Sequence, residues 1–352
     1  MKIDPAILRA LSLSPSDTTL SAHGGSGFAT TGKLTTTLPD GSKKHLFLKT
    51  GQGKDSETMF AGEHASLNAL HTIPSLCPQS FAHGKLDSGA GAFLVTDFLD
   101  LSTSRSSTSS QQEGSGMSLA QKLARLHTTP APTPEGYSKP MFGFPMPTCC
   151  GDTEQPNDYT ESWAEFYAEH RLMAILRKSE ENNGKDGALR SMVEKTAKQI
   201  VPRLIADGHL NGGRGVTPVV VHGDLWSGNK GRGRIGGEGA VEDVVFDPSS
   251  CYAHNEYELG IMRMFGGFGA AFLKEYHQLC PKTEPIEEYE DRVALYELYH
   301  HLNHHVSCIA LVLPFHLKVL IMGKAIFGGG YKSGAVSIMR DLHRKYADKN
   351  EL

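Results

Sequence analysis

Hydrophobic and polar side chains alternate through the first hundred positions as they do in short β-strands. The alternation is clear in residues 45–49, and a glycine turn and a Pro-Asp-Gly turn at 39–41 divide the segment from 21 to 50. A further apolar run covers residues 92–95. A period of two, with turn residues between the runs, is typical of antiparallel strands. A twisted antiparallel sheet is therefore expected here.

The pattern changes to a helical period first at residues 56–71 and then throughout the chain after residue 117. Helical spacing is strong at 158–178 and recurs between 284 and 327. A β-rich part followed by a helical part predicts an α+β fold of two lobes, residues 1–100 and 101–352, with a hinge near 96–100. Two loops are expected in the second lobe: residues 102–116 are Ser-rich and of low complexity, and residues 231–239 look like a hairpin loop enlarged with glycine.

The stretch from Pro218 to Asp247 holds polar residues at the ends of two apolar runs. The first run ends in His222-Gly223-Asp224, and the second ends in Asp247. Asp224 and Asn229 have the D-x-x-x-x-N spacing of the kinase catalytic loop, and Asp247 follows a strand as the metal-binding Asp of kinases does. An ordinary Gly-Asp turn is the alternative for Asp224 alone. The three residues in this order favour catalysis.

Phosphoryl transfer explains why these residue types occur together. One carboxylate must orient the attacking hydroxyl and accept its proton, and hard oxygen ligands must hold Mg²⁺ against the phosphates of ATP. Asp224 is therefore predicted to be the catalytic base, and Asn229 and Asp247 the metal ligands.

A lysine and a glutamate upstream complete the kinase pattern. Phe60, Glu63, Leu67 and Leu70 follow one another at spacings of three, four and three, which places Glu63 within an apolar stripe. A carboxylate that faces a core needs a cation, and Lys49 is the nearest upstream candidate. The pair would grip the α- and β-phosphates. A glutamate at the edge of the stripe that reaches water is the alternative.

Two further segments are predicted to contact the nucleotide. A glycine cluster between two strands would let the backbone approach phosphates, although it lacks the third glycine of G-x-G-x-x-G and a plain hairpin turn is the alternative. The hinge would contact the adenine base of the nucleotide. The residues are Gly24, Gly25, Ser26 and Gly27 in the cluster, and Asp97, Phe98 and Leu99 in the hinge.

Composition narrows the class of partner. The chain has 352 residues, 39% of them hydrophobic and 21% charged, and a net charge of -4, which fits a soluble globular protein and gives no electrostatic footprint for nucleic acid. Asp4 and Pro5 interrupt the apolar run that a signal peptide needs, and Pro314 breaks the longest apolar segment. We expect a cytosolic protein with a small-molecule partner and no membrane contact.

Cysteines and histidines give little sign of a metal centre. The six cysteines show no C-x-x-C spacing and are expected to be reduced and buried. His300, His301, His304 and His305 have i, i+4 spacing that suits zinc, but no third ligand is evident, so core and surface histidines on one helix are favoured.

Several motifs together resemble the fructosamine-3-kinase family, also called ketosamine or protein-ribulosamine kinases. The resemblance covers roughly residues 20 to 345. Its motifs are FAGEHASLNAL at 60–70, TCCG at 148–151, HGDLWSGN at 222–229, FDPSSCYAHNEYELG at 246–260, MFGGF at 264–268 and LNHH at 302–305.

This resemblance implies a protein-kinase-like fold of the aminoglycoside-phosphotransferase type, with ATP and Mg²⁺ as cofactors. It implies phosphorylation of the sugar 3-hydroxyl of fructosamines or ribulosamines, free or on protein lysines, after which the unstable adduct falls off and the glycated protein is repaired. Trp226 and His222 are expected to contact the sugar, and the chain is expected to be a monomer or weak homodimer. The family's frequent cysteine in the glycine loop is missing, since Phe28 follows Gly27.

Two other functions stay open at this point. The same fold could act on another alcohol, such as an aminoglycoside or choline. The chain could also be a nucleotide-binding pseudoenzyme that serves as a scaffold, although the presence of all five expected catalytic residues argues against it.

Overall fold

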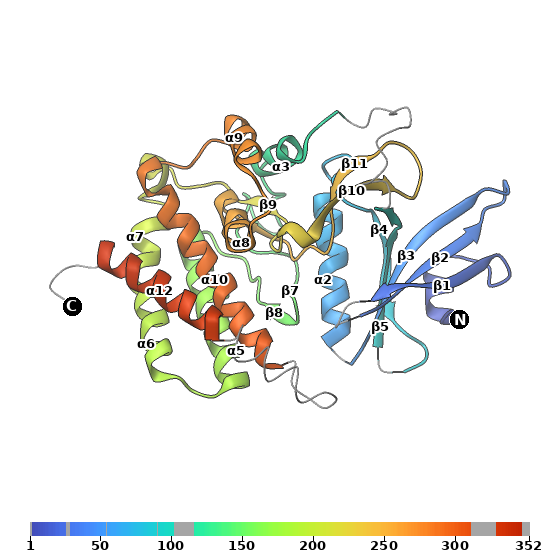
Figure 1. The fold of residues 1–352 in the computed structure, drawn as a ribbon, viewed down its shortest axis with the longest axis horizontal. Coiled ribbons are helices and arrows are strands. Elements are labelled where there is room, and N and C mark those ends of the chain that lie inside the picture. The colour runs from blue at the N-terminus through green and yellow to red at the C-terminus, as the bar shows by residue number, and fades with distance from the viewer. Residues whose placement is uncertain are drawn as a thin grey trace. The chain divides into compact units, whose positions relative to one another are not determined.

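The structure is a computed structural model that describes residues 2–25, 29–53, 55–89, 91–101, 116–310 and 329–346. The chain divides into two compact units (Figure 1). The first unit consists of Met1–Leu126 and Gly228–Ser250, and the second of His127–Ser227 and Cys251–Leu352. The hinge near residues 96–100 stays a prediction.

The first unit is built on an antiparallel sheet of five strands. Their order is β1-β2-β3-β5-β4, and every neighbouring pair is antiparallel. The strands are β1 (Thr18–Gly25), β2 (Thr30–Thr37), β3 (Lys43–Gln52), β4 (Ser80–Lys85) and β5 (Gly91–Asp97).

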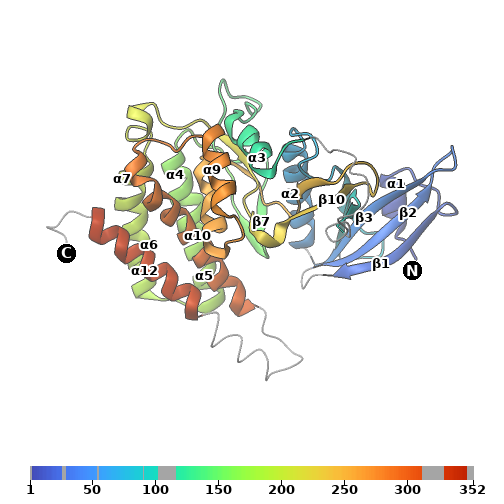
Figure 2. The same cartoon turned by 45° about the horizontal axis from the view of Figure 1, so that its top comes forward.

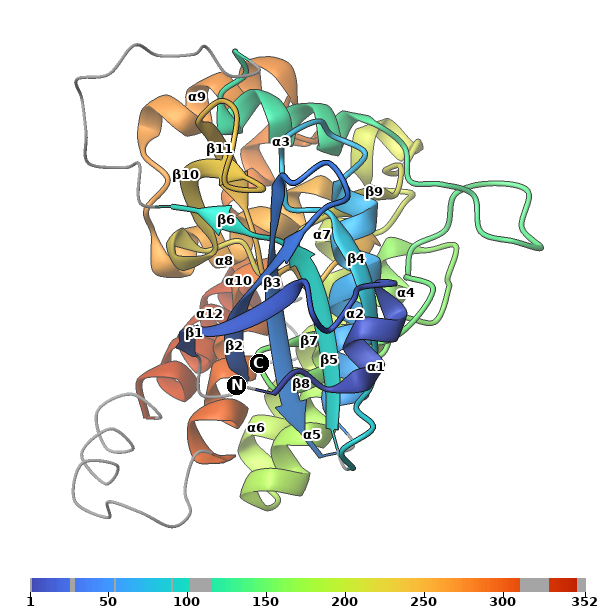
Figure 3. The ribbon, with the colours of Figure 1, turned by 90° about the vertical axis from the view of Figure 1, so that its right-hand side faces the viewer.

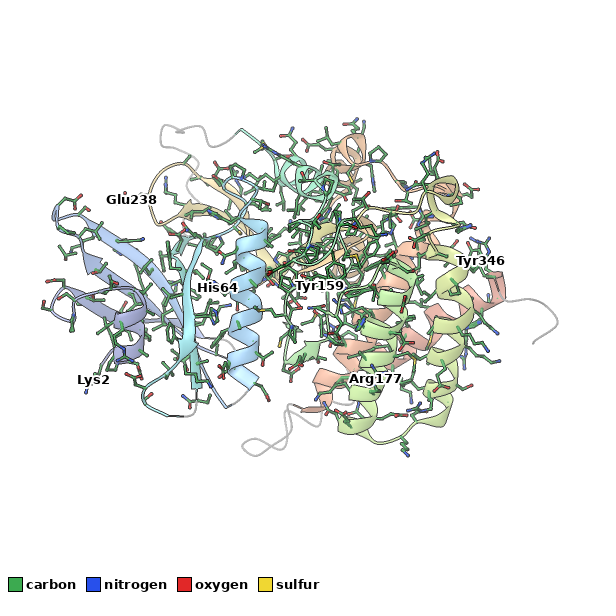
Figure 4. The ribbon with its side chains drawn as sticks, turned by 180° about the vertical axis from the view of Figure 1, so that it is seen from behind. Lys2, His64, Tyr159, Arg177, Glu238 and Tyr346 are labelled. Carbon is green, nitrogen blue, oxygen red and sulfur yellow. The ribbon has the colours of Figure 1, made fainter. Side chains whose placement is uncertain are left out.

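Helices α1 (Pro5–Ala10) and α2 (Asp55–Leu70) cover opposite faces of this sheet (Figure 3). Leu46 and Leu48 of β3 point into the core that Ile7 of α1 shares. Because side chains alternate along a strand, Phe47 and Lys49 point to the face that α2 covers. The alternation expected from the sequence thus sends Lys49 toward α2. On the same helix, His64, labelled in Figure 4, bonds Ser80 of β4 at 2.8 Å.

A second sheet of the first unit has the order β11-β10-β6, formed by β6 (Leu99–Asp100), β10 (Lys230–Ile235) and β11 (Glu242–Val245). The glycine-rich segment 231–239, expected to be a loop, is a strand up to residue 235 and then a turn that carries Glu238 (Figure 4). A Cβ on Gly233 would lie 2.5 Å from the carbonyl oxygen of Asp100. Glycine is needed there because β6 approaches the backbone of β10 so closely.

Helix α3 (Leu119–Thr128) is tied to this second sheet by a buried lysine. The Nζ of Lys122 donates to Glu242 Oε2 at 2.8 Å and to the carbonyl oxygens of Ser75 and Asp243, each at 2.9 Å. These bonds hold the start of β11.

The second unit is mostly helical (Figure 2). Helix α10 contacts α5, α8 and α12, and two short ribbons, β7-β8 and β12-β9, complete the unit. The helices are α4 (Trp163–Tyr167), α5 (Ala174–Asn183), α6 (Gly187–Lys195), α7 (Val201–Ile205), α8 (Glu258–Phe265), α9 (Ala270–Leu279), α10 (Tyr289–Ala310) and α12 (Gly329–Tyr346). The strands are β7 (Thr148–Cys150), β8 (Thr153–Gln155), β9 (Val219–Val221) and β12 (Cys251–Ala253).

Irregular helical turns join some of these elements. π-helical turns lie at Ala168–Met173 and Thr196–Ile200, and 3₁₀ turns at Leu210–Gly213, Ser227–Asn229, Asn255–Tyr257 and Ile286–Glu288. The helix expected at 158–178 begins at Trp163, where Ser162 caps it by accepting from the Glu165 N–H.

Aromatic rings in edge-to-face and tilted contact form the core of the second unit. Trp163, Tyr167, Tyr257 and Tyr296 are all buried and lie within ring contact of one another. The indole N–H of Trp163 donates to the hydroxyl of Tyr296 at 2.8 Å, so the polar atoms of these two rings satisfy each other inside the core.

Within the described residues, none of the helices combines the length and apolar character needed to cross a membrane. In that part of the chain no three or more His, Cys, Asp and Glu side chains are grouped so that they could hold a metal ion, the histidines of α10 included.

Candidate active site

Lys49 lies between two carboxylates in the first unit. Its Nζ donates to Glu63 Oε1 at 2.6 Å and to Asp247 Oδ1 at 2.7 Å. The side chains of Lys49 and Glu63 are 13% and 12% exposed, whereas that of Asp247 is 52% exposed. A buried pair therefore meets an exposed carboxylate, and the three form one charged cluster.

Three elements bring this cluster together. Lys49 projects from the α2 face of β3, Glu63 lies in the middle of α2, and Asp247 follows the end of β11. Asp247 has φ 57°, in the left-handed region that residues other than glycine rarely occupy. Strained backbone of this kind is concentrated at functional sites, because surrounding contacts must hold it in place.

The shared lysine sets the charge state of the cluster. Burial alone would lower the pKa of Lys49, but the charges of Glu63 and Asp247 outweigh burial and raise that pKa. Burial raises the pKa of Glu63, Lys49 opposes this change, and Asp247 adds to it. Lys49 is therefore firmly a cation whose charge two carboxylates share.

A cavity of about 530 Å³ opens beside this cluster, inside the first unit. It combines the charged residues with apolar side chains from the sheet and with the segment that follows β5, which suits a ligand with both a ring and phosphates. The lining residues are His23, Thr31, Phe47, Lys49, Glu63, Leu67, Pro78, Thr96, Asp97, Leu99, Leu101, Phe246 and Asp247.

The residues predicted to contact a nucleotide are placed in different ways. Asp97 and Leu99 line the cavity, whereas Phe98 is buried with its ring 4.9 Å from that of His23 and 4.2 Å from the Lys33 Nζ. Gly24 and Gly25 end β1, and Gly24 has a positive φ of 70°. Ser26 and Gly27 lie outside the described residues.

Asn229 and Asp247 are brought together by the pairing of β10 with β11. Lys230 pairs with Val245, and the Phe246 N–H donates to the Asn229 carbonyl oxygen at 3.1 Å. The two predicted ligands thus stand at the same end of this ribbon. A carboxylate and an amide oxygen suit Mg²⁺, which is usually held by one or two protein ligands together with phosphates and water.

In the second unit, Glu258 holds the loop that carries Asp224. Its carboxylate accepts the backbone N–H groups of His222 at 2.5 Å and Gly223 at 3.0 Å, and His127 Nε2 lies 3.6 Å away. Glu258 is fully buried, and although burial would raise its pKa, the nearby His127 and the N–H of His222 lower it. A permanent carboxylate therefore fixes this loop.

The neighbours of Asp224 are a histidine and a cysteine. The Asp224 N–H donates to His222 Nδ1 at 3.3 Å. His222 is fully buried, so it supports the loop from within, and this position does not favour the sugar contact that the resemblance implied. The Cys150 thiol donates to Asp224 Oδ1 at an Sγ to oxygen distance of 3.7 Å. Asp224 is only partly buried, in contrast to His222 and Cys150.

Trp226 stands two residues after Asp224 and is 38% exposed. Its ring lies 5.6 Å from that of Phe265, which in turn lies 5.0 Å from the ring of His304. The second unit therefore presents an aromatic surface next to the loop, of a kind that can stack on the face of a sugar.

Comparison with known proteins decides the family. The family model described as "Fructosamine kinase" matches residues 21–308. The mouse (Mus musculus) protein named ketosamine-3-kinase is 31% identical over 317 residues, which cover 87% of this chain and 90% of that protein. The chain belongs to the fructosamine kinase family.

Other relatives of this fructosamine kinase agree. A chloroplastic protein-ribulosamine 3-kinase of Oryza sativa is 33% identical over 300 residues, which cover 85% of this chain and 72% of that protein. A solved structure from Haemophilus somnus, assigned to the fructosamine-3-kinases, superposes with a TM-score of 0.67 at 19% identity and covers 97% of this chain and 96% of that one. The predicted family, the α+β protein-kinase-like fold and the phosphotransferase class are confirmed.

The sequence did not reveal every residue that shapes the site of this fructosamine kinase. Glu258 and Cys150 stand in motifs that carry the family resemblance, yet nothing in their spacing connects them with the loop at 222–224. Phe47 and Thr96 of the cavity could have been found, because strand alternation places both on the same face as Lys49.

Proposed function

We propose that this fructosamine kinase transfers the γ-phosphoryl group of ATP to the sugar 3-hydroxyl of ketosamines, such as ribulose-lysine and fructose-lysine adducts. The curated relatives are named ketosamine-3-kinase and protein-ribulosamine 3-kinase. The observation that carries the proposal is the Lys49, Glu63 and Asp247 cluster beside a cavity large enough for a nucleotide.

Nucleotide binding is assigned to the first unit. Lys49 grips the α- and β-phosphates, and Glu63 keeps the ammonium in place, as the corresponding pair does in kinases. The base contacts the segment from Asp97 to Leu99, and the apolar side chains of the cavity remove its rings from water. The glycines at 24–27 stay assigned to the phosphates.

The metal is assigned to Asn229 and Asp247, which supply an amide oxygen and a carboxylate. When bound, Mg²⁺ neutralises charge on the phosphate oxygens. The exposure of Asp247 fits this role, because a carboxylate that receives a hydrated cation must be reachable. Lys49 would then turn from Asp247 toward phosphate.

Asp224 is assigned the role of catalytic base. Its carboxylate orients the 3-hydroxyl and accepts its proton while the oxygen bonds to the γ-phosphorus and the bond to ADP breaks. Trp226 is assigned to stack on the sugar, and His222 holds the loop. Catalysis then consists of positioning and charge neutralisation.

The product of this reaction is a ketosamine 3-phosphate, which is unstable and releases the amine. The proposed biological role is therefore the repair of glycated proteins. All assigned groups come from one chain, so the expected monomer or weak homodimer would be sufficient.

The first experiment measures ADP release from ATP and Mg²⁺ with ribulose-lysine and fructose-lysine adducts, for the wild type and Asp224→Asn. We expect turnover with at least one adduct and a loss of about 10³-fold in kcat in the variant. Nucleotide affinity, measured by calorimetry, should stay within about threefold, since the variant keeps the size of the side chain.

Two results would contradict the proposal. Wild-type protein that binds ATP but turns over neither adduct would favour another alcohol or a scaffold role, and an acceptor screen that includes choline and aminoglycosides separates these two. Near-normal turnover in Asp224→Asn would remove the role of base from Asp224.

A further inference from the structure

The β7-β8 hairpin carries the T-C-C-G motif, which has no part in the roles assigned above. The hairpin is held by a buried polar network. The Thr148 hydroxyl donates to Gln155 Oε1 at 3.2 Å, the Gln155 amide donates to the Tyr299 hydroxyl at 2.7 Å, and the Asn157 amide donates to Thr148 Oγ1 at 3.0 Å. All four side chains are at least 97% buried, so the hairpin is rigidly fixed.

Cys150 is fixed from a second side by α10. The Asn303 amide donates to the carbonyl oxygen of Cys150 at 3.2 Å, and Cys150 pairs with Thr153 across the hairpin. Cys150 is only 1% exposed and Asn303 only 2%. The position of the Cys150 sulfur is therefore fixed by the surrounding protein.

The surroundings keep this sulfur protonated. Burial, and after it the nearby Asp224 carboxylate, raises the pKa of the Cys150 thiol well above its usual range. A thiol that keeps its proton can donate, and the atom it reaches is Asp224 Oδ1 at 3.7 Å.

We propose that Cys150 is a positioning residue for the catalytic base, and that its S–H group holds the Asp224 carboxylate in one rotamer by donating to Oδ1. The inference rests on the proposed function, which makes Asp224 the base. A thiol is a weak donor, so it orients the carboxylate without greatly reducing its affinity for the substrate's proton. A stronger donor would stabilise the ionised form and make a poorer base.

The test separates the effect of losing the S–H donor from the effect of losing side-chain volume at position 150. Cys150→Ser keeps a donor, Cys150→Val keeps the volume and removes the donor, and Cys150→Ala removes both. Cys149→Ala is the matched control, because Cys149 lies next along β7 and is less buried. Each variant is assayed for kcat and KM with the adduct that the wild type turns over, and for nucleotide affinity and Tm.

We expect kcat to fall about tenfold in Cys150→Val and Cys150→Ala. In both variants the KM for the adduct and the nucleotide Kd should stay within about twofold of the wild type. Cys150→Ser should lose only about threefold in kcat, because the hydroxyl still orients Asp224 although it stabilises the ionised carboxylate more than a thiol does, and Cys149→Ala should match the wild type. If Cys150→Ala fails to fold, the comparison of Ser with Val decides.

A valine variant as active as the wild type, or more active than the serine variant, would overturn the inference and leave the proposed function intact. A loss that falls on KM alone would overturn it in the same way. Absence of turnover in the wild type would remove both.

Discussion

Two largely buried glutamates, one in each unit, have their negative charge compensated by different kinds of group. Glu63 faces an ammonium group that it shares with Asp247, and burial raises its pKa. Glu258 accepts two backbone N–H groups beside His127, and its pKa is lowered despite complete burial. The cost of burying a negative charge is therefore compensated more fully at Glu258 than at Glu63.

The difference matches the role proposed for each unit. A lysine shared by two carboxylates can exchange partners, which suits a site that must receive phosphates and a cation. Backbone N–H groups cannot leave their carboxylate without unfolding the loop, which suits a base that must stay in one place. We expect the cluster in the first unit to respond to ligands and the loop in the second unit to stay fixed.

The largest effect should come from removing the shared cation. Lys49→Met leaves a buried Glu63 without its partner and should reduce the free energy of unfolding by about 3 to 5 kcal/mol. The double variant Lys49→Met with Glu63→Gln should recover most of this loss but still fail to bind nucleotide. Chemical denaturation and nucleotide titration measure the two effects, and a double variant as unstable as the single one would contradict the pairing.

A histidine in the second unit extends the comparison to a group where burial again prevails. His254 bonds the Tyr296 hydroxyl and the Thr283 hydroxyl, each at 2.8 Å, and burial lowers its pKa from 6.5 to about 4. The folded state therefore binds fewer protons than the unfolded chain between pH 6.5 and 4. Stability is complete above pH 6.5 and falls as the pH drops toward 4, by about 3 kcal/mol in total.

Unfolding free energies measured from pH 7 to pH 4 for the wild type and His254→Gln check this expectation. The variant should lose less stability over that range, because its amide does not titrate. Parallel curves for the two proteins would mean that His254 has an ordinary pKa.

The smallest effect compares the two glutamates directly. Glu258→Gln turns one acceptor into a donor that faces a backbone N–H, and it should cost about 2 kcal/mol of stability and lower kcat. Glu63→Gln should cost less stability, because burial already opposes the charged form of Glu63 and Asp247 still pairs with Lys49 in the variant. Thermal unfolding of both variants tests the order, and the reverse order would show that the shared lysine compensates Glu63 fully.

Local patterns in the sequence predict the parts of the site that local geometry determines. Strand alternation places Lys49 toward α2, and the three, four and three spacing turns Glu63 toward the sheet, so this pair could be expected. The bond from Lys49 to Asp247 joins residues that lie 198 positions apart, and the bond from the His222 N–H to Glu258 joins residues 36 positions apart. Only the folded chain defines such contacts. The same reason hides Cys150, which meets Asp224 from 74 residues away.

The strand status of residues 231–235 was missed for a related cause. Glycine is a poor strand former by propensity, so Gly231 and Gly233 indicated a loop. Here the close approach of β6 excludes any larger residue at Gly233, and tertiary packing overrides the local preference.

Strand β10 has a further consequence, because its two ends touch opposite parts of the proposed nucleotide site. At one end Ile235 pairs with Leu99, and at the other Lys230 pairs with Val245 beside Asn229 and Asp247. The strand rises roughly 17 Å between these points. The length of β10 therefore sets the distance between the proposed contact with the adenine base and the proposed metal ligands. Deleting one residue from β10 should mismatch the site to the length of ATP without removing any residue assigned to contact the ligand.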